Sequence, residues 1–208
     1  SRDEPIPQLH YLATQITVVL HYLRLMVWPV GLNLDPEWPL YRSFFATPVL
    51  LAFSALAALV LATSYIFKRF QADPRAALAL AFTAWYFVTI SVSSSLIPLP
   101  DMVAEHRSYL PSVGVFVILA CLGDWLRQVR LPAAIGRFAL PVAAVLVLSG
   151  LAWKTNNRNN CWSSTENLWR DTAAKSPGKF RVWGNLGAAV SDAGKDNEAV
   201  TYFKKSVE

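Results

Sequence analysis

The sequence predicts an all-α protein in which a polytopic transmembrane helical domain is followed by a region of helical-hairpin repeats. Of its 208 residues, 54% are hydrophobic and only 16% are charged, which is a composition typical of membrane proteins. Apolar runs of about 20 residues recur along the chain, and a helix of that length crosses the hydrocarbon core of a bilayer. Near the end, a more polar stretch carries the residue spacing of a helical repeat.

The membrane domain is predicted over residues 1–155 and the repeat region over residues 156–208. Four membrane spans are expected, at about 47–67, 76–97, 109–126 and 134–153. The first of them is uncharged throughout, and its Pro48 lies in the first helical turn, where a missing backbone N–H does little harm. Because the sequence stops inside a repeat, we expect a truncated repeat region and further repeats in a longer parent protein.

An amphipathic helix is predicted over about residues 9–28, ahead of the first span. Its polar residues recur at steps of four and three, which places them on one helix face: His10, Thr14, Thr17, His21 and Arg24. Arg24 at the centre of a bilayer would cost about 3 kcal/mol, so we expect this helix to lie at the interface or to face a polar cavity. Two interpretations stay open. The face is a solvated stripe, or His21 and Arg24 point at an anionic ligand such as a lipid phosphate.

The basic residues favour one membrane topology. One side of the membrane receives Lys68, Arg69, Arg75, Arg127, Arg130 and Arg137, whereas the other receives Arg42 and Arg107. Because cytoplasmic loops carry the excess of Lys and Arg, we expect the Asp35 loop, the Glu105 loop and the repeats to lie outside the cytoplasm. Basic residues beside apolar runs explain the net charge of +5 and favour a membrane partner over nucleic acid. Asp124 and Arg127 are also spaced to pair along one helix.

The stretch 93–114, between the second and third spans, is dense in polar side chains. Asp101, Glu105, His106, Arg107 and Tyr109 fall within nine positions, close to prolines that stiffen the backbone. A simple turn needs only a few polar residues, so this density favours a binding or catalytic site. The alternative is a structural turn in which Glu105 and Arg107 satisfy one another.

The tail carries the spacing of a tetratricopeptide repeat. The pattern W-x2-L-G-x2-Y…A-x3-F is matched by Trp183, Leu186, Gly187, Val190, Ala199 and Phe203, with Val190 in the place of Tyr. In this register, residues 162–174 form the second helix of a degenerate preceding repeat. Trp183 and Asn185 are predicted to bind an acceptor or partner protein. An ordinary amphipathic helical hairpin is the alternative.

Three features together resemble one known family: the segments 11–35 (YLATQITVVLHYLRLMVWPVGLNLD) and 94–114 (SSLIPLPDMVAEHRSYLPSVG), and a membrane domain that runs into tetratricopeptide repeats. They resemble the transmembrane and tetratricopeptide-repeat-containing proteins and their bacterial relatives, which belong to the GT-C glycosyltransferases. The string D-x3-EHR-x-YLP at 101–111 is the most specific part. The resemblance implies a membrane enzyme that transfers a sugar, mannose in the animal members, from a polyprenyl-phosphate donor to protein hydroxyls at the non-cytoplasmic face. The repeats would present the acceptor.

The resemblance also implies which residues act on the donor. In that family the catalytic carboxylate lies in the first extracytoplasmic loop, near the N-terminus, and no segment here corresponds to it. We therefore expect this chain to be the C-terminal part of the membrane domain with the first repeats, and to be inactive alone. A departing phosphate develops negative charge, which Arg binds by paired hydrogen bonds. Donor-phosphate contacts are predicted at Arg107 and His106, with Arg24 and His21 as a second set.

The carboxylates of the central loop have several open roles. Asp101 and Glu105 could orient Arg107, bind a divalent metal, or assist in deprotonating the acceptor. Cys121 and Cys161 have neither disulfide nor metal-ligand spacing, so residue spacing predicts no metal site.

The alternative function is a non-catalytic, membrane-anchored scaffold whose repeats bind partner proteins. The absence of Asn-x-Ser/Thr sequons from the Asn-rich tail favours a bacterial inner membrane, with the repeats outside the cytoplasm. The alternative location is the endoplasmic reticulum membrane, with the repeats in the lumen.

Overall fold

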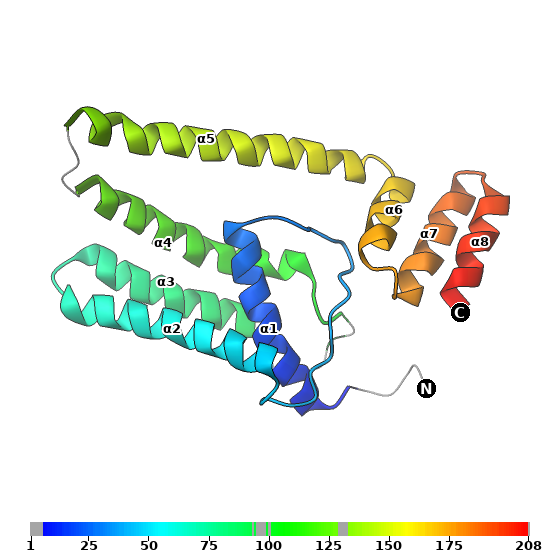
Figure 1. Ribbon diagram of the computed structural model, residues 1–208, viewed down its shortest axis with the longest axis horizontal. Helices are drawn as coiled ribbons and strands as arrows, with labels where there is room; N and C mark the ends of the chain where they lie inside the picture. Colours follow the sequence, from blue (N-terminus) through cyan, green and yellow to red (C-terminus); the bar gives the residue numbers. More distant parts are fainter. Residues whose placement is uncertain (1–5, 93, 95–98, 100, 129–132, 208) are drawn as a thin grey trace. The chain divides into compact units, whose positions relative to one another are not determined.

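The computed structural model describes residues 6–92, 94, 99, 101–128 and 133–207 (Figure 1). In these residues the chain forms eight α-helices, two short 3-10 helices and no strand, so the predicted all-α class is confirmed. The chain divides into two compact units. The first unit holds the residues up to Leu32 and Trp38–Gln128, and the second holds Asn33–Glu37 and the residues from Val129 onwards.

The first unit is built from long helices. Its described residues form α1 (Gln8–Val27), α2 (Thr47–Arg69), α3 (Pro74–Ser91), the 3-10 helix η1 (Glu105–Ser108) and α4 (Tyr109–Gln128). Two segments of the described chain are long and apolar enough to cross a membrane: α2, with a mean hydropathy of 2.2, and η1 with α4, with a mean hydropathy of 1.7. They contain the predicted spans 47–67 and 109–126. The predicted span 76–97 follows α3 as far as Ser91, and its residues 93 and 95–97 lie outside the described part.

The helix ends follow local sequence signals. Pro48 lies in the first turn of α2, as predicted. Asp73 precedes α3, and its carboxylate accepts the backbone N–H of Arg75 at 2.9 Å, which satisfies one of the free donors at the helix start. α1 ends at Val27, two residues before Pro29, whose ring and missing N–H do not fit a helix interior. Short-range rules therefore account for where these elements begin and end.

Exposed apolar side chains cover much of α2. Leu51, Phe53, Leu61 and Tyr65 are each at least 59% exposed, although side chains of this kind are mostly buried in soluble proteins. Contiguous exposed apolar surface marks a contact with a membrane or another protein, and the length of α2 fits a bilayer. These observations support membrane association of the first unit.

α1 supplies much of the core of the first unit. Tyr11 and Tyr22 are completely buried, and Val18 and Leu25 pack in the same helix. The Tyr86 hydroxyl of α3 donates a hydrogen bond to a main-chain carbonyl oxygen of α1 at 2.7 Å. A buried hydroxyl needs such a partner, so this bond fixes α3 against α1.

The second unit contains α5 (Ala133–Asn159), the 3-10 helix η2 (Asn160–Trp162), α6 (Thr165–Lys175), α7 (Phe180–Asp192) and α8 (Asp196–Val207). The predicted span 134–153 lies on α5, which continues past its internal Pro141 to Asn159. The predicted domain boundary at residue 155 falls inside this helix and stays a prediction. An ion pair between Arg158 and Asp171 joins α5 to α6.

α7 and α8 form a helical hairpin with its own small core. Val182, Leu186 and Val190 of α7 pack with Ala199 of α8. Where the two helices cross, a Cβ added to Gly187 would lie 2.8 Å from the Phe203 ring. Close packing of a large residue onto a small one at this crossing is consistent with a tetratricopeptide-like fold.

Replacing Gly187 with alanine should lower the free energy of unfolding of this hairpin by about 1–3 kcal/mol, because the new Cβ would overlap the Phe203 ring. Gly184 is the matched control, since its Cβ would approach Ser206 no closer than 3.8 Å. Gly184→Ala should be neutral or stabilising by up to about 1 kcal/mol. Hydrogen exchange of the α7 and α8 amides measures both effects, and equal exchange in the two variants would contradict the close crossing.

Candidate functional site

The chain that follows α1 folds back along the polar face of that helix. The Trp38 indole N–H donates to the Thr17 hydroxyl at 3.0 Å, and the Tyr41 backbone N–H donates to the Thr14 hydroxyl at 2.9 Å. Both threonines are buried, so the interpretation of this face as a solvated stripe is wrong at these two positions. The polar face instead holds the segment that leads to α2.

His21 and Arg24, the second predicted set of phosphate contacts, lie further along the same face. The His21 ring packs against the Trp38 ring, with the centroids 4.6 Å apart. Arg24 donates to the Val30 carbonyl oxygen at 3.0 Å, and its other terminal nitrogen lies 3.4 Å from Nδ1 of His21. The Arg24 side chain is exposed, and a carbonyl oxygen orients a guanidinium without cancelling its charge. The role of this pair in binding phosphate stays a prediction.

Two hydrogen bonds hold the central loop against buried side chains of α1. The Gln15 side-chain amide donates to the Met102 carbonyl oxygen at 3.0 Å, and the Ala104 N–H donates to the Tyr22 hydroxyl at 2.9 Å. Gln15 and Tyr22 are both buried, where an unmade hydrogen bond costs about 1–3 kcal/mol. These bonds fix the backbone just before η1, which carries the predicted site residues 105–107.

A pocket of about 290 Å³ lies where η1 meets the end of α1 and the start of α4. Its polar lining comes from Glu105, His106, Ser108 and Ser112, and its more apolar lining from Leu25, Met26, Leu32, Tyr109 and Phe116. Pockets of this kind bind ligands through many apolar contacts and a few placed polar groups. The arrangement therefore fits an amphiphilic ligand. Of this lining, Glu105 and His106 are predicted site residues, whereas Ser108, Ser112 and the contribution of α1 were not predicted.

Arg107 is oriented by its own loop. Its guanidinium donates to the backbone carbonyl oxygen of Asp101 at 2.9 Å. A guanidinium has five N–H donors, and this bond uses one of them without compensating the positive charge. The roles predicted for the Asp101 and Glu105 carboxylates stay predictions. Within the described ranges, no group of three or more His, Cys, Asp or Glu residues is placed to hold a metal ion.

The segment Asn33–Glu37, between α1 and α2, belongs to the second unit. Its Asp35 side chain is only 5% exposed, and its two carboxylate oxygens pair with Lys179 at 2.5 Å and with Arg181 at 2.7 Å. Removal of a carboxylate from water is unfavourable unless it is paired, and here two cations at the start of α7 provide the pairing.

Further hydrogen bonds surround this ion pair. The buried Ser176 hydroxyl accepts from the Asn33 side-chain amide at 2.8 Å and from the Glu37 backbone N–H at 3.0 Å. The Glu37 carboxylate in turn accepts the Gly178 N–H at 3.2 Å. We call these contacts, between Asn33–Glu37 and residues 176–181, the Asp35 clamp. Sequence reasoning missed the clamp, because no local pattern pairs Asp35 with a residue 144 positions away.

Trp183, a predicted contact to an acceptor or partner protein, is largely engaged inside the second unit. Its indole N–H donates to the Pro177 carbonyl oxygen at 2.7 Å, and its ring stacks on Tyr202 with centroids 6.0 Å apart. The Lys205 ammonium lies 4.6 Å from the Trp183 ring centroid. Asn185 is half-buried on the same helix. A binding role for Trp183 and Asn185 stays a prediction.

An ion-pair network joins α6 to α8. Arg170 lies 2.8 Å from Glu166 and 2.6 Å from Glu198, and Lys195 lies 2.9 Å from Glu166. Hydrogen bonds from Lys195 and Arg170 lower the pKa of Glu166, and hydrogen bonds from Arg170 and the Tyr202 hydroxyl lower the pKa of Glu198. Both carboxylates are therefore charged at neutral pH.

The described residues thus define an all-α protein with two candidate membrane spans, an amphiphilic pocket and a terminal hairpin consistent with a helical repeat. Its homologues are protein O-mannosyl-transferases of the TMTC (transmembrane and tetratricopeptide-repeat-containing) type. The chain is 29% identical to "Protein O-mannosyl-transferase TMTC1" of Homo sapiens over an alignment of 125 residues. This alignment covers 58% of this chain and 14% of the relative. It is 31% identical to "Protein O-mannosyl-transferase Tmtc3" of Drosophila melanogaster over an alignment of 159 residues. This alignment covers 76% of this chain and 16% of the relative.

A third relative, "Protein O-mannosyl-transferase TMTC1" of Mus musculus, is 26% identical over an alignment that covers 99% of this chain. The chain spans between 14% and 22% of the length of these three relatives. No family model and no solved structure matches the chain. The names of these relatives agree with the family that the sequence motifs resemble.

Replacing Asp35 with asparagine should weaken the Asp35 clamp by about 1–3 kcal/mol, because Lys179 and Arg181 would face each other without the charge that pairs them. Hydrogen exchange at the Glu37 and Gly178 amides, which are hydrogen-bonded in the clamp, should become faster. Asp192→Asn is the matched control, because it removes the same charge from an exposed position. Unchanged exchange in Asp35→Asn would contradict the clamp.

Acid should loosen the contact between α6 and α8. A carboxylate with a lowered pKa stabilises the fold fully above its ordinary value, which is 4.5 for these glutamates, and this stabilisation is lost as the pH falls through the lowered values. The protection factors of the amides in α6 and α8 should therefore fall below about pH 4. A Glu166→Gln, Glu198→Gln double variant should be less protected at neutral pH and should respond less to acid. An acid response of the same size in both proteins would exclude these carboxylates as its origin.

Proposed function

We propose that this chain forms part of a GT-C type membrane glycosyltransferase that transfers a sugar from a polyprenyl-phosphate donor to protein at the non-cytoplasmic face. The observation that carries the proposal is the pocket in which polar side chains of η1 meet apolar side chains of α1. A polyprenyl phosphate has the same division, with a charged phosphate at the end of a long apolar chain. Homology to proteins named protein O-mannosyl-transferases supports sugar transfer to protein.

The polar end of the pocket is suited to the phosphate. His106 lines the pocket and is exposed, and Arg107 is the next residue of the same 3-10 helix. The bond from Arg107 to the Asp101 carbonyl oxygen restrains the guanidinium while its charge stays available. As the sugar leaves, negative charge grows on the phosphate oxygens, and a cation already in position stabilises that charge without reorganisation.

The apolar end of the pocket is suited to the lipid chain. Leu25 and Met26 of α1 and Phe116 of α4 line it, and the segment that contains α4 is a candidate membrane span. A polyprenyl chain could therefore pass from this wall into the surrounding bilayer. Arg24 and His21, on the adjacent face of α1, form the second set of donor contacts in this proposal.

The Asp35 clamp supports the proposed location of the repeats. Asn33–Glu37 is part of the loop between α1 and α2, and it contacts residues 176–181 directly. Two segments in contact lie on the same side of a membrane. This agrees with the topology from the basic residues, in which the Asp35 loop and the repeats are both non-cytoplasmic. An acceptor protein that binds near Trp183 and Asn185 would then be on the side where transfer occurs.

The test is transfer of labelled sugar from a polyprenyl-phosphate donor to protein, by the full-length protein in membranes. Wild type should transfer label, and Arg107→Ala should lose transfer by about 10²-fold or more, as expected for a lost contact to developing charge. A rise in the donor concentration needed for half-maximal rate would place Arg107 at the phosphate. His106→Ala should also reduce transfer, and it tests the pocket with little risk to folding because His106 is exposed.

Arg42→Ala is the matched control, because Arg42 is an exposed arginine on the same predicted side of the membrane. It should retain wild-type transfer at equal expression. Full activity in Arg107→Ala and His106→Ala would leave an enzyme whose donor site lies elsewhere. Absence of transfer from every donor tested would favour the scaffold function.

A further inference from the structure

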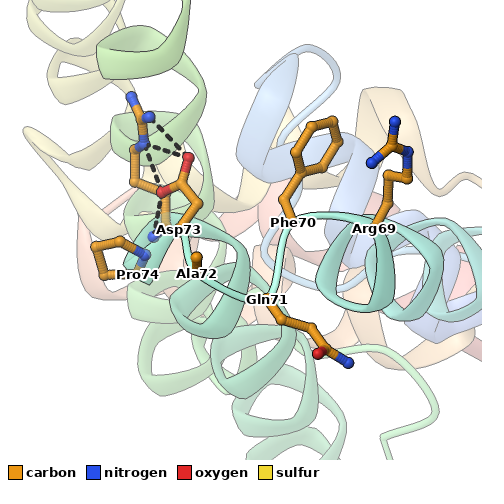
Figure 2. Close-up of a pocket in the computed structure, with 7 residues that line it drawn as sticks. Arg69, Phe70, Gln71, Ala72, Asp73 and Pro74 are labelled. Atoms are coloured by element: carbon orange, nitrogen blue, oxygen red, sulfur yellow. Dashed lines mark hydrogen bonds and ion pairs between the residues drawn. The ribbon is translucent and has the colours of Figure 1, made fainter.

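The turn between α2 and α3 forms a second pocket, of about 520 Å³, lined by residues 69–75. Figure 2 shows the Arg69 and Phe70 side chains on the same side of this turn, with Gln71 directed the other way. The Arg69 guanidinium lies 5.5 Å from the centroid of the Phe70 ring, within the range of a cation–π contact. The proposed sugar transfer makes no use of this pocket.

Arg75 gives the turn a rigid base. It donates to Asp73 at 2.7 Å, to Asp124 of α4 at 3.2 Å and to Gln128 at 3.1 Å. Asp124, which the sequence spacing pairs with Arg127, therefore pairs with Arg75 instead. These bonds fasten the start of α3, which lines the pocket, to the end of α4.

The positive charge beside the pocket comes from Lys68 and Arg69, because the nearby carboxylates are paired with Arg75. Both carboxylates near the turn, Asp73 and Asp124, are held by Arg75. They do not compensate Lys68 and Arg69, whose side chains are exposed. The geometry therefore separates one arginine that is structural from two cations that face solvent.

The pocket also lies where a lipid headgroup is expected. Lys68 and Arg69 are the last residues of α2, which is a candidate membrane span. Tyr65 and Phe70 beside them are 68% and 50% exposed. Aromatic and basic side chains at the end of a span lie at the level of the lipid headgroups, and basic residues there attract anionic lipids.

We propose that this pocket binds the headgroup of an anionic phospholipid. Arg69 binds the phosphate through paired N–H donors, and Lys68 contributes a second charge from the end of the same helix. The exposed Phe70 ring contacts the apolar region next to the headgroup. A zwitterionic headgroup carries its own cation, so two protein cations select for net negative charge. This inference is independent of the proposed transfer reaction and concerns a different pocket.

The experiment is native mass spectrometry of the full chain in detergent, with phosphatidylglycerol or phosphatidylcholine added. Wild type should retain phosphatidylglycerol in preference to phosphatidylcholine. Lys68→Gln with Arg69→Gln should reduce phosphatidylglycerol retention by about fivefold per charge removed. Lys204→Gln with Lys205→Gln is the matched control, because it removes two adjacent charges from α8, and it should bind as wild type does. Inorganic phosphate in large excess should not displace the lipid.

Three outcomes would overturn the proposal. Equal loss in the α8 control would show a response to total charge rather than a site at the turn. Equal retention of phosphatidylcholine would remove the selectivity that the two cations should provide. Displacement by inorganic phosphate would show a free-anion site instead. Phe70→Ala adds a check without a change of charge, since it should weaken retention of phosphatidylglycerol while both cations remain, and unchanged retention would remove the ring from the site.

Discussion

Burial of the Asp35 carboxylate is the constraint that the second unit depends on. A carboxylate that is 5% exposed is costly to bury unless it is paired, and Lys179 and Arg181 reach its two oxygens. The pairing brings Asn33–Glu37 into the unit that contains α6, α7 and α8, although this segment is continuous in sequence with α1 and α2. A loop that connects two helices of one unit thereby becomes a structural part of the other.

The sequence predicts the elements well because their signals are local. The apolar run at 47–67, Pro48 at its start and Pro29 after α1 each act within a few residues, and the helices follow them. The unpredicted features are contacts between distant residues. The helical spacing of Thr14 and Thr17 is compatible with a solvated polar face. In the structure, the segment that follows α1 covers both side chains. The partners of such groups are set by the packing of whole helices, which short-range spacing does not encode.

The same distinction applies to the candidate site. The density of charge between Asp101 and Tyr109 indicated a site, and Glu105 and His106 do line a pocket. The apolar wall from Leu25 and Met26 is not visible in the sequence, because these residues are ordinary members of an apolar helix. It becomes part of a site only once hydrogen bonds from Gln15 and to Tyr22 fix the loop over α1. The charged lining from Glu105 and His106 can be predicted from the sequence, whereas the apolar lining from Leu25 and Met26 depends on how the helices pack.

The group that each of four arginines contacts distinguishes a structural arginine from candidate phosphate ligands. Arg75 is bound by two carboxylates, so its charge is cancelled and its bonds fasten one helix to another. Arg107 and Arg24 bond to carbonyl oxygens, and Arg69 lies over an aromatic ring. Oxygen and ring both restrain a guanidinium while leaving it a net cation. A restrained cation loses little conformational entropy when it binds an anion, so these three arginines suit the phosphate contacts proposed for them better than Arg75 does.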